Sequence, residues 1–264
     1  MVVEQKLSNA QIEGLAGDYE ARTAEETLEW ALKAFGDRVG LISSFQAETM
    51  IVLDMAHRLG LPVRVVTIDT GRLPEETYAL IDRVRQRYDI SVEIIYPDMQ
   101  DLQELTEEHG INPFYRSVSL RLLCCDMRKV RPMKRALDGL DAWISGLRRS
   151  QSGTRANVAK IELDSTHDDK IKVNPLADWS QEQVWDYVKS RDVPYNELYD
   201  QGYTSIGCSP CTRPTEPGED PRAGRWWWEK GVPKECGIHV TLDGVHPMKE
   251  IDPDGRPRDS QPDL

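Results

Sequence analysis

Long apolar runs are absent from this sequence of 264 residues. No stretch approaches the roughly 20 apolar residues that a membrane span requires. The first residues, from Met1 to Lys6, also lack the apolar run of a signal peptide. We therefore expect a cytoplasmic protein, in a compartment where thiols stay reduced and paired cysteines are more often metal ligands than disulfides.

The 33 Lys and Arg residues are outnumbered by 45 Asp and Glu residues. The formal net charge is −12, which argues against a general surface for nucleic acid or anionic membrane. A phosphate loop of the form Ser-Gly-Gly-x-Asp-Ser is also missing. Local basic groups on an acidic protein are typical of a pocket for a small anion. Two such groups are present, Arg148, Arg149 and Arg155 in one and Arg213, Arg222 and Arg225 in the other.

Strand-like and helix-like segments alternate after residue 38. Hydrophobic residues make up 39% of the chain, which is enough for a sizeable core without disulfides. The alternation predicts an α/β fold with a doubly wound, mostly parallel sheet. The expected strands are Val39–Ser43, Val63–Ile68, Val92–Tyr96 and Ala142–Ser145, and the expected helices are Thr49–Leu59, Glu75–Tyr88, Leu102–His109 and Val130–Leu137. The loops after Ser43, Ile68 and Ser145 should line one crevice at the carboxyl ends of the strands.

Capping patterns predict two further helices. Thr23 and Glu26 form a capping box before a helix that ends near Phe35. Ser180 and Gln183 can cap a helix that carries the apolar residues between positions 184 and 188. Beyond residue 207, frequent proline and glycine predict an irregular segment that lies over the crevice.

Four of the five cysteines occur in two tight pairs. Cys124 and Cys125 are adjacent, and Cys208 and Cys211 form a C-x-x-C motif. Such a set indicates zinc or an iron–sulfur cluster. Adjacent side chains point about 100° apart on a helix, so a single small ion would require a contorted backbone. A cubane offers separate irons at separate corners. The spacing therefore favours one [4Fe–4S] cluster, with zinc and unligated buried thiols as alternatives.

The fifth cysteine, Cys236, stands apart within the segment Lys234–His239. Arg222, Arg225 and His239 could lower the pKa of Cys236 from about 8.5 by stabilising its thiolate. These cationic neighbours make it a candidate nucleophile. Three consecutive tryptophans, at positions 226–228, precede it. They cannot all face one core, so some must lie over a neighbouring segment, a ligand or a partner.

Three loops carry candidate ligand-binding residues. The loop from Ser43 through Ser44 to Glu48 joins a strand to a helix, whose first N–H groups can bind phosphate. Asp69 ends the next strand, where it can contact a ribose hydroxyl. The loop at 145–155 combines small residues with arginines, which offer fork-shaped donors for phosphate or sulfate. Its candidates are Gly146, Arg149 and Arg155.

Together these motifs resemble the assimilatory adenylyl-sulfate reductases, the iron–sulfur branch of the phosphosulfate reductase family. The resemblance runs from about residue 39 to residue 239. Its most specific parts are the adjacent cysteines with Cys-Ser-Pro-Cys-Thr-Arg-Pro at 208–214, Gly-Arg-Trp-Trp-Trp at 224–228, and Glu-Cys-Gly-Ile-His at 235–239. It implies a fold of the adenine-nucleotide α-hydrolase-like type. It also implies a cytoplasmic enzyme of sulfate assimilation and cysteine biosynthesis.

The resemblance further implies a thiol-dependent reduction of adenosine 5′-phosphosulfate. The cysteine at 236 would attack the sulfur, AMP would leave, and thioredoxin or glutaredoxin would release sulfite from the S-sulfocysteine. A thiolate is a soft nucleophile suited to sulfur, and cations must offset the charge of the phosphosulfate. By resemblance, Lys129 lies between cluster and substrate, Arg155, Arg222 and Arg225 hold the phosphosulfate, and the 43–48 loop, Leu73 and Gly146 surround AMP.

These expectations divide the chain into four parts. They are an N-terminal helical segment at 1–38, a nucleotide-binding α/β domain with the iron–sulfur site at 39–212, a catalytic flap carrying Cys236 at 213–239, and a tail at 240–264. The end of the tail is rich in Asp, Pro, Arg and Gly, which predicts disorder.

Three alternatives stay open at this point. The nearest is reduction of 3′-phosphoadenosine 5′-phosphosulfate. A more distant one is an iron–sulfur tRNA-thiolating enzyme, which the acidic composition and the missing phosphate loop disfavour. The third is a zinc-stapled binding module that uses the tryptophans as a docking face.

We expect the unphosphorylated nucleotide to be preferred, because only Arg72 is basic among the ribose-side candidates, which include Asp69, Thr70 and Glu48. The sequence leaves a homo-oligomer and the thiol donor open.

Overall fold

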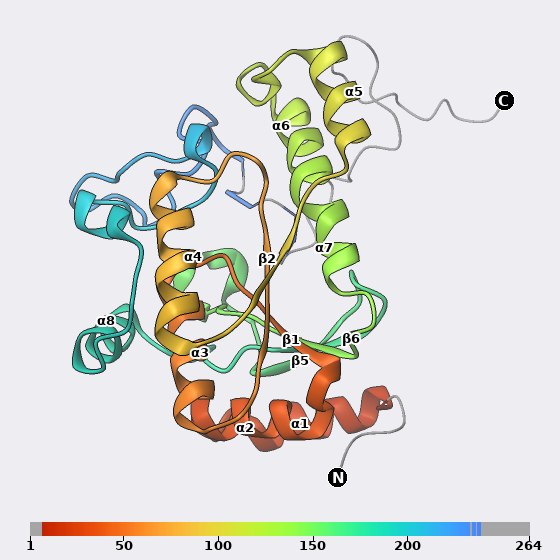
Figure 1. Cartoon of the computed structure of the whole chain (residues 1–264), viewed down its shortest axis with the longest axis vertical. Helices are drawn as coiled ribbons and strands as arrows, with labels where there is room; N and C mark the ends of the chain where they lie inside the picture. The colour runs from red at the N-terminus through yellow and green to blue at the C-terminus, as the bar shows by residue number, and fades with distance from the viewer. Residues whose placement is uncertain (1–6, 233, 236, 239–264) are drawn as a thin grey trace, which may run out of the picture.

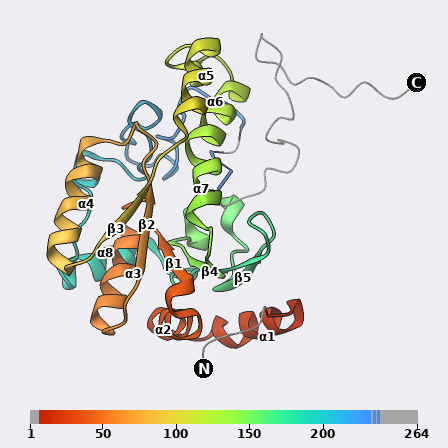
Figure 2. The same ribbon diagram turned by 45° about the vertical axis from the view of Figure 1, so that its right-hand side comes forward.

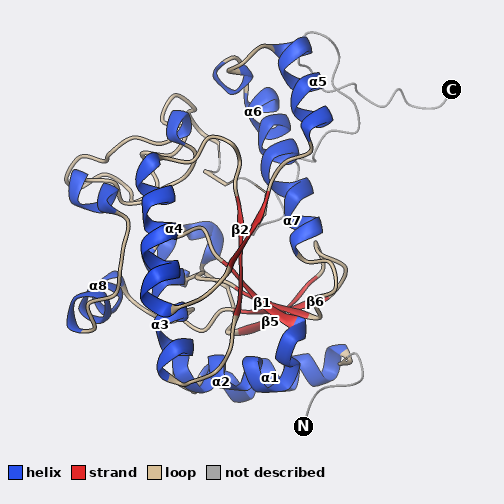
Figure 3. Ribbon diagram, viewed as in Figure 1, coloured by secondary structure: helices blue, strands red, loops and turns tan. Residues whose placement is uncertain are grey.

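A six-stranded sheet forms the centre of the computed structural model (Figures 1 and 3). The structure describes residues 7–232, 234, 235, 237 and 238. Two predicted catalytic residues, Cys236 and His239, therefore lie outside the described residues, as does the tail predicted at 240–264. No helix in the described part is long and apolar enough to cross a membrane.

The sheet has the strand order β3-β2-β1-β4-β6-β5. Neighbouring strands pair in parallel, except that β5 runs antiparallel to β6. In the register, Leu41 of β1 lies between Val65 of β2 and Ile144 of β4. The strands are β1 Val39–Ile42, β2 Arg64–Ile68, β3 Val92–Ile95, β4 Ala142–Ile144, β5 Ile161–Asp164 and β6 Lys170–Val173. The chain leaves β1 toward β2 and later returns to β4 on its other side, which makes a topological switch point.

Helices cover both faces of the sheet. On one face, α2 and α3 contact β1 and α8 packs on α3, whereas α7 contacts β2 and β3 from the other face. Figure 2 shows α5 and α6 at the end of the molecule opposite α1 and α2. The α-helices are α1 Asn9–Glu20, α2 Ala24–Phe35, α3 Ala47–Arg58, α4 Glu75–Tyr88, α5 Met99–His109, α6 Val118–Cys125, α7 Arg131–Ala136 and α8 Gln181–Ser190. The predicted doubly wound α/β fold is confirmed.

The capping predictions are confirmed at α2 and α8. The Thr23 side chain accepts from the Glu26 N–H at the start of α2, and the Glu26 carboxylate accepts from the Thr23 N–H. Ser180 and Gln183 make the same reciprocal pair at α8. Each pair satisfies N–H groups that a helix start leaves without partners.

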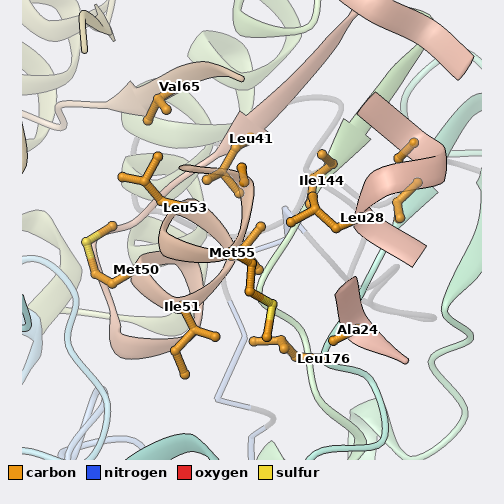
Figure 4. Packing of buried hydrophobic residues seen from close by; sticks show 14 of the residues in the cluster. Ala24, Leu28, Leu41, Met50, Ile51, Leu53, Met55, Val65, Ile144 and Leu176 are labelled. Atoms are coloured by element: carbon orange, nitrogen blue, oxygen red, sulfur yellow. The ribbon is translucent and has the colours of Figure 1, made fainter. Parts of the chain in front are cut away.

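The core lies against the face covered by α2, α3, α4 and α8. Helix α3 is buried from Ala47 to Ala56, because it is sandwiched between the sheet and its neighbouring helices. Figure 4 shows Met50, Leu53 and Met55 of α3 among side chains from the strands and from α2. A smaller cluster on the other face joins Met133 and Leu137 to the buried Trp143. The two clusters fix the sheet edge at which the loops meet.

Three elements are absent from the prediction, namely α6, β5 and β6. Their strand and helix patterns are interrupted by charged residues that find partners only in the folded chain. Lys172 of β6 is buried and pairs with Glu162 of β5 at 2.9 Å. Arg121 of α6 is buried and pairs with Glu229 at 2.8 Å. Because 108 residues separate that second pair, local patterning hides it.

Candidate active site

One pocket opens at the carboxyl ends of β1, β2 and β4. Its lining comes from all three of the loops that the sequence analysis placed there, and also from the segment after residue 205. The position coincides with the switch point between β1 and β4, where open α/β sheets bind ligands. Four of the described lining side chains are cationic and two are acidic.

The β1–α3 loop contains a residue other than glycine in a strained, left-handed backbone conformation. Phe45 is fully buried and has a φ of 55°, a left-handed conformation that is unfavourable for a bulky residue and is found mostly where function requires it. The Ser43 hydroxyl accepts from the Phe45 N–H at 3.1 Å and donates to the Thr49 hydroxyl at 3.0 Å. Ser43, Ser44 and Glu48 thereby line the pocket.

The β4 loop approaches α3 so closely that residue 146 must be glycine. A Cβ at Gly146 would lie 2.7 Å from the Cβ of Glu48. The Glu48 carboxylate is held by the guanidinium of Arg148, with Nε at 3.0 Å and Nη2 at 2.9 Å. Both side chains are buried, so this acid enters the pocket wall with its charge already offset.

Part of the pocket lining is cationic. Lys129, Arg155, Arg222 and Arg225 all line it. Arg225 is 5% exposed and stacks on the ring of Trp226 at 4.7 Å. Its Nη1 makes only long hydrogen bonds, 3.4 Å each, to Ser205 and Ile206, and its Nε has no partner among the described residues. A buried guanidinium with so few acceptors is suited to bind an anion.

The four paired cysteines line a second pocket. All four are buried, and they share this pocket with Arg72, Arg128, Lys129 and Trp226. Cys124 and Cys125 end α6, and the next turn, η3 (Asp126–Val130), is π-helical. Such wide turns are rare and often mark functional sites. Lys129 and Cys208 line both pockets, so the thiols adjoin the cationic part of the first one.

Cations and burial act against each other on these thiols. Burial raises the pKa of Cys208, but Lys129, a hydrogen bond with Thr70 and Arg225 outweigh it, so the pKa is lowered. The Thr70 hydroxyl lies 3.2 Å from its sulfur. Burial dominates at the other two shifted thiols, where it raises the pKa of Cys124 and raises the pKa of Cys211 to about 12. In the described part of the chain, no group of three or more His, Cys, Asp or Glu side chains is placed to hold one metal ion.

Most of the predicted ligand-binding residues line the first pocket. Two do not. The carboxylate of Asp69 accepts from the Gly71 N–H at 2.7 Å and from the Tyr78 hydroxyl at 2.8 Å. Arg149 pairs with Glu20 at 2.8 Å, away from the pocket. Those that line it are Ser43, Ser44, Glu48, Leu73, Lys129, Gly146, Arg155, Arg222 and Arg225.

Two further lining residues, Gln151 and Glu235, were not assigned a role from the sequence. Gln151 donates to Glu48 at 3.0 Å and accepts from Arg155 at 2.6 Å. Glu235 pairs with Arg155 and Arg222. Both occur within motifs that the sequence analysis quoted, but their partners are up to 103 residues away, which no local signal reveals.

The fold and the two pockets define an α/β protein that binds an anionic ligand beside a set of four thiols. The chain belongs to the phosphoadenosine phosphosulfate reductase family, whose domain pattern matches residues 38–214. It is 48% identical over 205 residues to the adenosine 5′-phosphosulfate reductase of Burkholderia cepacia, a match that covers 78% of this chain and 82% of that one. The resemblance seen in the sequence is thereby confirmed.

Two other known proteins support this assignment. The adenosine 5′-phosphosulfate reductase of Pseudomonas aeruginosa strain LESB58 is 44% identical over 231 residues, covering 86% of this chain and 85% of that one. The crystal structure of phosphoadenylyl-sulfate reductase from Candida auris, a phosphate complex, superposes with a TM-score of 0.68 and 31% identity. That likeness covers 79% of this chain and 99% of the other.

Proposed function

We propose that the chain reduces adenosine 5′-phosphosulfate to sulfite and AMP, as a step of sulfate assimilation and cysteine biosynthesis. The observation that carries the proposal is the cationic part of the switch-point pocket, where Lys129, Arg155, Arg222 and Arg225 line one space. Two more lining residues, Glu235 and Ile238, flank Cys236 in the sequence. The names of the relatives from Burkholderia and Pseudomonas support the choice of substrate.

The chemistry begins with the thiolate of Cys236, which lies outside the described residues. It attacks the sulfur of the phosphosulfate, the bond from sulfur to the bridging oxygen breaks, and AMP leaves with the electron pair. The S-sulfocysteine is then attacked at its Sγ by a thiolate of an external dithiol protein, thioredoxin or glutaredoxin. Sulfite leaves, and the second thiol resolves the mixed disulfide. The dithiol supplies both electrons.

The cations make this attack feasible. Two negatively charged groups of the substrate would otherwise repel the approaching thiolate. Guanidinium forks bind such groups through paired N–H donors, and they act most strongly in a site from which water is excluded. Arg155, Arg222 and Arg225 are each less than one-tenth exposed, which supports their assignment to the phosphosulfate. His239, outside the described residues, stays a proposed catalytic neighbour.

We also propose that the paired cysteines hold one [4Fe–4S] cluster per chain. The donor set fits, because four buried thiols line a single pocket whose cations favour thiolates. A cluster offers separate metal atoms, which suits thiols from adjacent residues such as Cys124 and Cys125. When bound, the cluster would add an electrostatic centre beside Lys129, which lines both pockets. Zinc is the alternative that metal analysis decides.

Three arginines that could have bound a 3′-phosphate already have partners in the chain. This supports a preference for the substrate without a 3′-phosphate. Arg72 donates to Asn112 and to the Ile111 carbonyl, Arg148 pairs with Glu48, and Arg149 pairs with Glu20. A 3′-phosphate adds about −1.5 to −2 charge at neutral pH. None of these three guanidinium groups could meet that charge without giving up acceptors that it already has.

The test is sulfite release from both nucleotides with the same thioredoxin. We expect kcat/KM to be at least about tenfold higher for adenosine 5′-phosphosulfate, because a 3′-phosphate without a cationic partner costs more than about 1.4 kcal/mol. An equal or higher value for the 3′-phosphorylated nucleotide would establish the alternative function, which the name of the Candida auris protein represents.

A further inference from the structure

The carboxylate of Glu235 is held like a bound anion. It is 3% exposed. Arg155 donates to it through Nε at 3.1 Å and Nη2 at 2.8 Å, and Arg222 donates through Nη2 at 3.1 Å. The hydroxyl of Thr154 adds a bond of 3.1 Å, and that of Ser152 adds one of 3.5 Å. The Glu235 carboxylate therefore accepts hydrogen bonds from two separate segments of the chain.

The donors that hold Glu235 are those that an anionic ligand needs. Arg155 and Arg222 line the pocket, and so does Glu235 itself. Burial opposes ionisation of the carboxyl, but the two arginines and Thr154 outweigh it and lower the pKa of Glu235. Part of the positive charge of the pocket is thus offset by a residue of the chain itself.

The backbone around Glu235 is anchored separately. Its carbonyl accepts from Nη1 of Arg121 at 2.8 Å, and Arg121 is itself buried and paired with Glu229. Nζ of Lys234 donates to the Glu229 carbonyl at 2.8 Å. These two contacts are made outside the pocket, whereas Nη2 of Arg222, which lines the pocket, donates to the Lys234 carbonyl. The hydrogen bonds from the arginines to the Glu235 side chain are therefore an additional attachment. They can be lost while the bond from Arg121 to the Glu235 carbonyl remains.

We propose that Glu235 is a positioning residue that fastens the segment carrying Cys236 to Arg155 and Arg222, and that its carboxylate shares these two guanidinium groups with the anionic group of the ligand and weakens the binding of that group by its like charge. This rests on the proposed role of Cys236 as the nucleophile. The ligand and Glu235 thus meet at the same two guanidinium groups, and Glu235 directly precedes Cys236 in the sequence.

The proposal predicts opposite effects on binding and on transfer. Glu235→Gln keeps the size of the side chain but removes its charge. The arginines then become more available to the ligand, so binding should tighten, by about threefold or more, because a like charge is removed from the anion site. The cysteine segment loses its fastening, so transfer to Cys236 should slow by at least about tenfold, since small misplacements of a reacting group are costly. A merely structural role would weaken both.

Two measurements test these effects. Binding of adenosine 5′-phosphosulfate is measured by titration calorimetry in the Cys236→Ser background, where no transfer can occur. Transfer is measured in the Cys236-containing chain as the rate at which Cys236 gains one sulfonate by mass spectrometry, without a dithiol. The control is Glu219→Gln, which also breaks a Glu–Arg pair in the C-terminal segment. Glu219 pairs with Arg213 on the surface and does not line the pocket.

Thr154→Val provides a second variant that keeps the buried charge pair. It removes one hydrogen bond to Glu235 from an exposed residue that does not line the pocket, so it should shift both quantities in the same directions by a smaller factor. Weaker binding in Glu235→Gln, or an unchanged rate of sulfonation, would overturn the proposal. If the unsubstituted chain gains no sulfonate, the proposed nucleophile is wrong and the positioning role falls with it, while calorimetry still decides whether Glu235 weakens the binding of the ligand.

Discussion

Replacement of Arg225 by alanine should damage catalysis far more than folding. The guanidinium is buried, it stacks on Trp226, and it makes two hydrogen bonds of 3.4 Å. No ion pair joins it to a carboxylate within the described residues. Its removal therefore leaves no buried charge of the chain without a partner, and the loss of the stacking costs about 1–2 kcal/mol of unfolding free energy.

We expect a larger effect on the reaction, because the charge of Arg225 is proposed to act on the substrate. Loss of one partner of a buried, hydrogen-bonded charge pair costs about 2–5 kcal/mol. At 1.4 kcal/mol per factor of ten, kcat/KM should fall by about 30-fold to several thousand-fold. Arg225→Lys keeps the charge but not the fork, so it should recover only part of the loss. Gly207 leaves room for the Arg225 guanidinium, because a Cβ at position 207 would lie 2.3 Å from Nη2 of Arg225.

The assay is sulfite release with saturating thioredoxin, together with urea unfolding of the same preparations. Arg213→Ala is the matched control, because Arg213 pairs with Glu219 on the surface and does not line the pocket. The reasoning would be refuted by an Arg225→Ala chain whose kcat/KM stays within threefold of the unsubstituted value. It would also be refuted by a fall in activity that unfolding of the variant fully explains.

Three further predictions concern Arg149, the paired cysteines and Asp164. Arg149→Ala should change kcat/KM by less than about twofold, because its partner is Glu20, and an exposed pair contributes at most about 1 kcal/mol; a tenfold loss in the sulfite assay would return Arg149 to the site. Anaerobically purified chain should contain about four irons and four sulfides, and Cys124→Ser should lose them; about one zinc and no iron would contradict the cluster. Burial raises the pKa of Asp164, but hydrogen bonds from His167 and Thr166 outweigh it and lower the pKa, so the stability that Asp164 contributes should be present above about pH 4 and lost as pH falls through the lowered pKa. Asp164→Asn should therefore destabilise less at pH 3 than at pH 7 in urea unfolding, and an equal loss at both pH values would speak against this.

The sheet and the helices α2 to α4 could be predicted because their signals are local. Strand β2 is a run of β-branched residues, α4 matches its predicted bounds of Glu75–Tyr88, and the start of α2 follows from the pair of Thr23 and Glu26. The crevice could be predicted from the alternation of strands and helices, since parallel strands place their following loops at one edge.

The directions of individual side chains could not be predicted. Arg148 and Arg149 are neighbours, yet one pairs with Glu48 in the pocket wall and the other with Glu20 outside it. The choice depends on the fold of the 145–155 loop against α3. Likewise, Glu235 finds Arg155 across 80 residues. Tertiary pairing of charges leaves no periodic trace in a sequence, so only the assembled pocket reveals it.

The central claim is that Cys236 carries the sulfonate between nucleotide and reductant. The direct measurement is the mass of Cys236 after incubation with adenosine 5′-phosphosulfate in the absence of any dithiol, with AMP measured in parallel. We expect one sulfonate on Cys236 for each AMP released, and sulfite only when thioredoxin is then added. We also expect that Cys236→Ser retains the cluster but releases no AMP. Sulfite formation by a chain whose Cys236 stays unmodified, or full turnover by Cys236→Ser, would contradict the account.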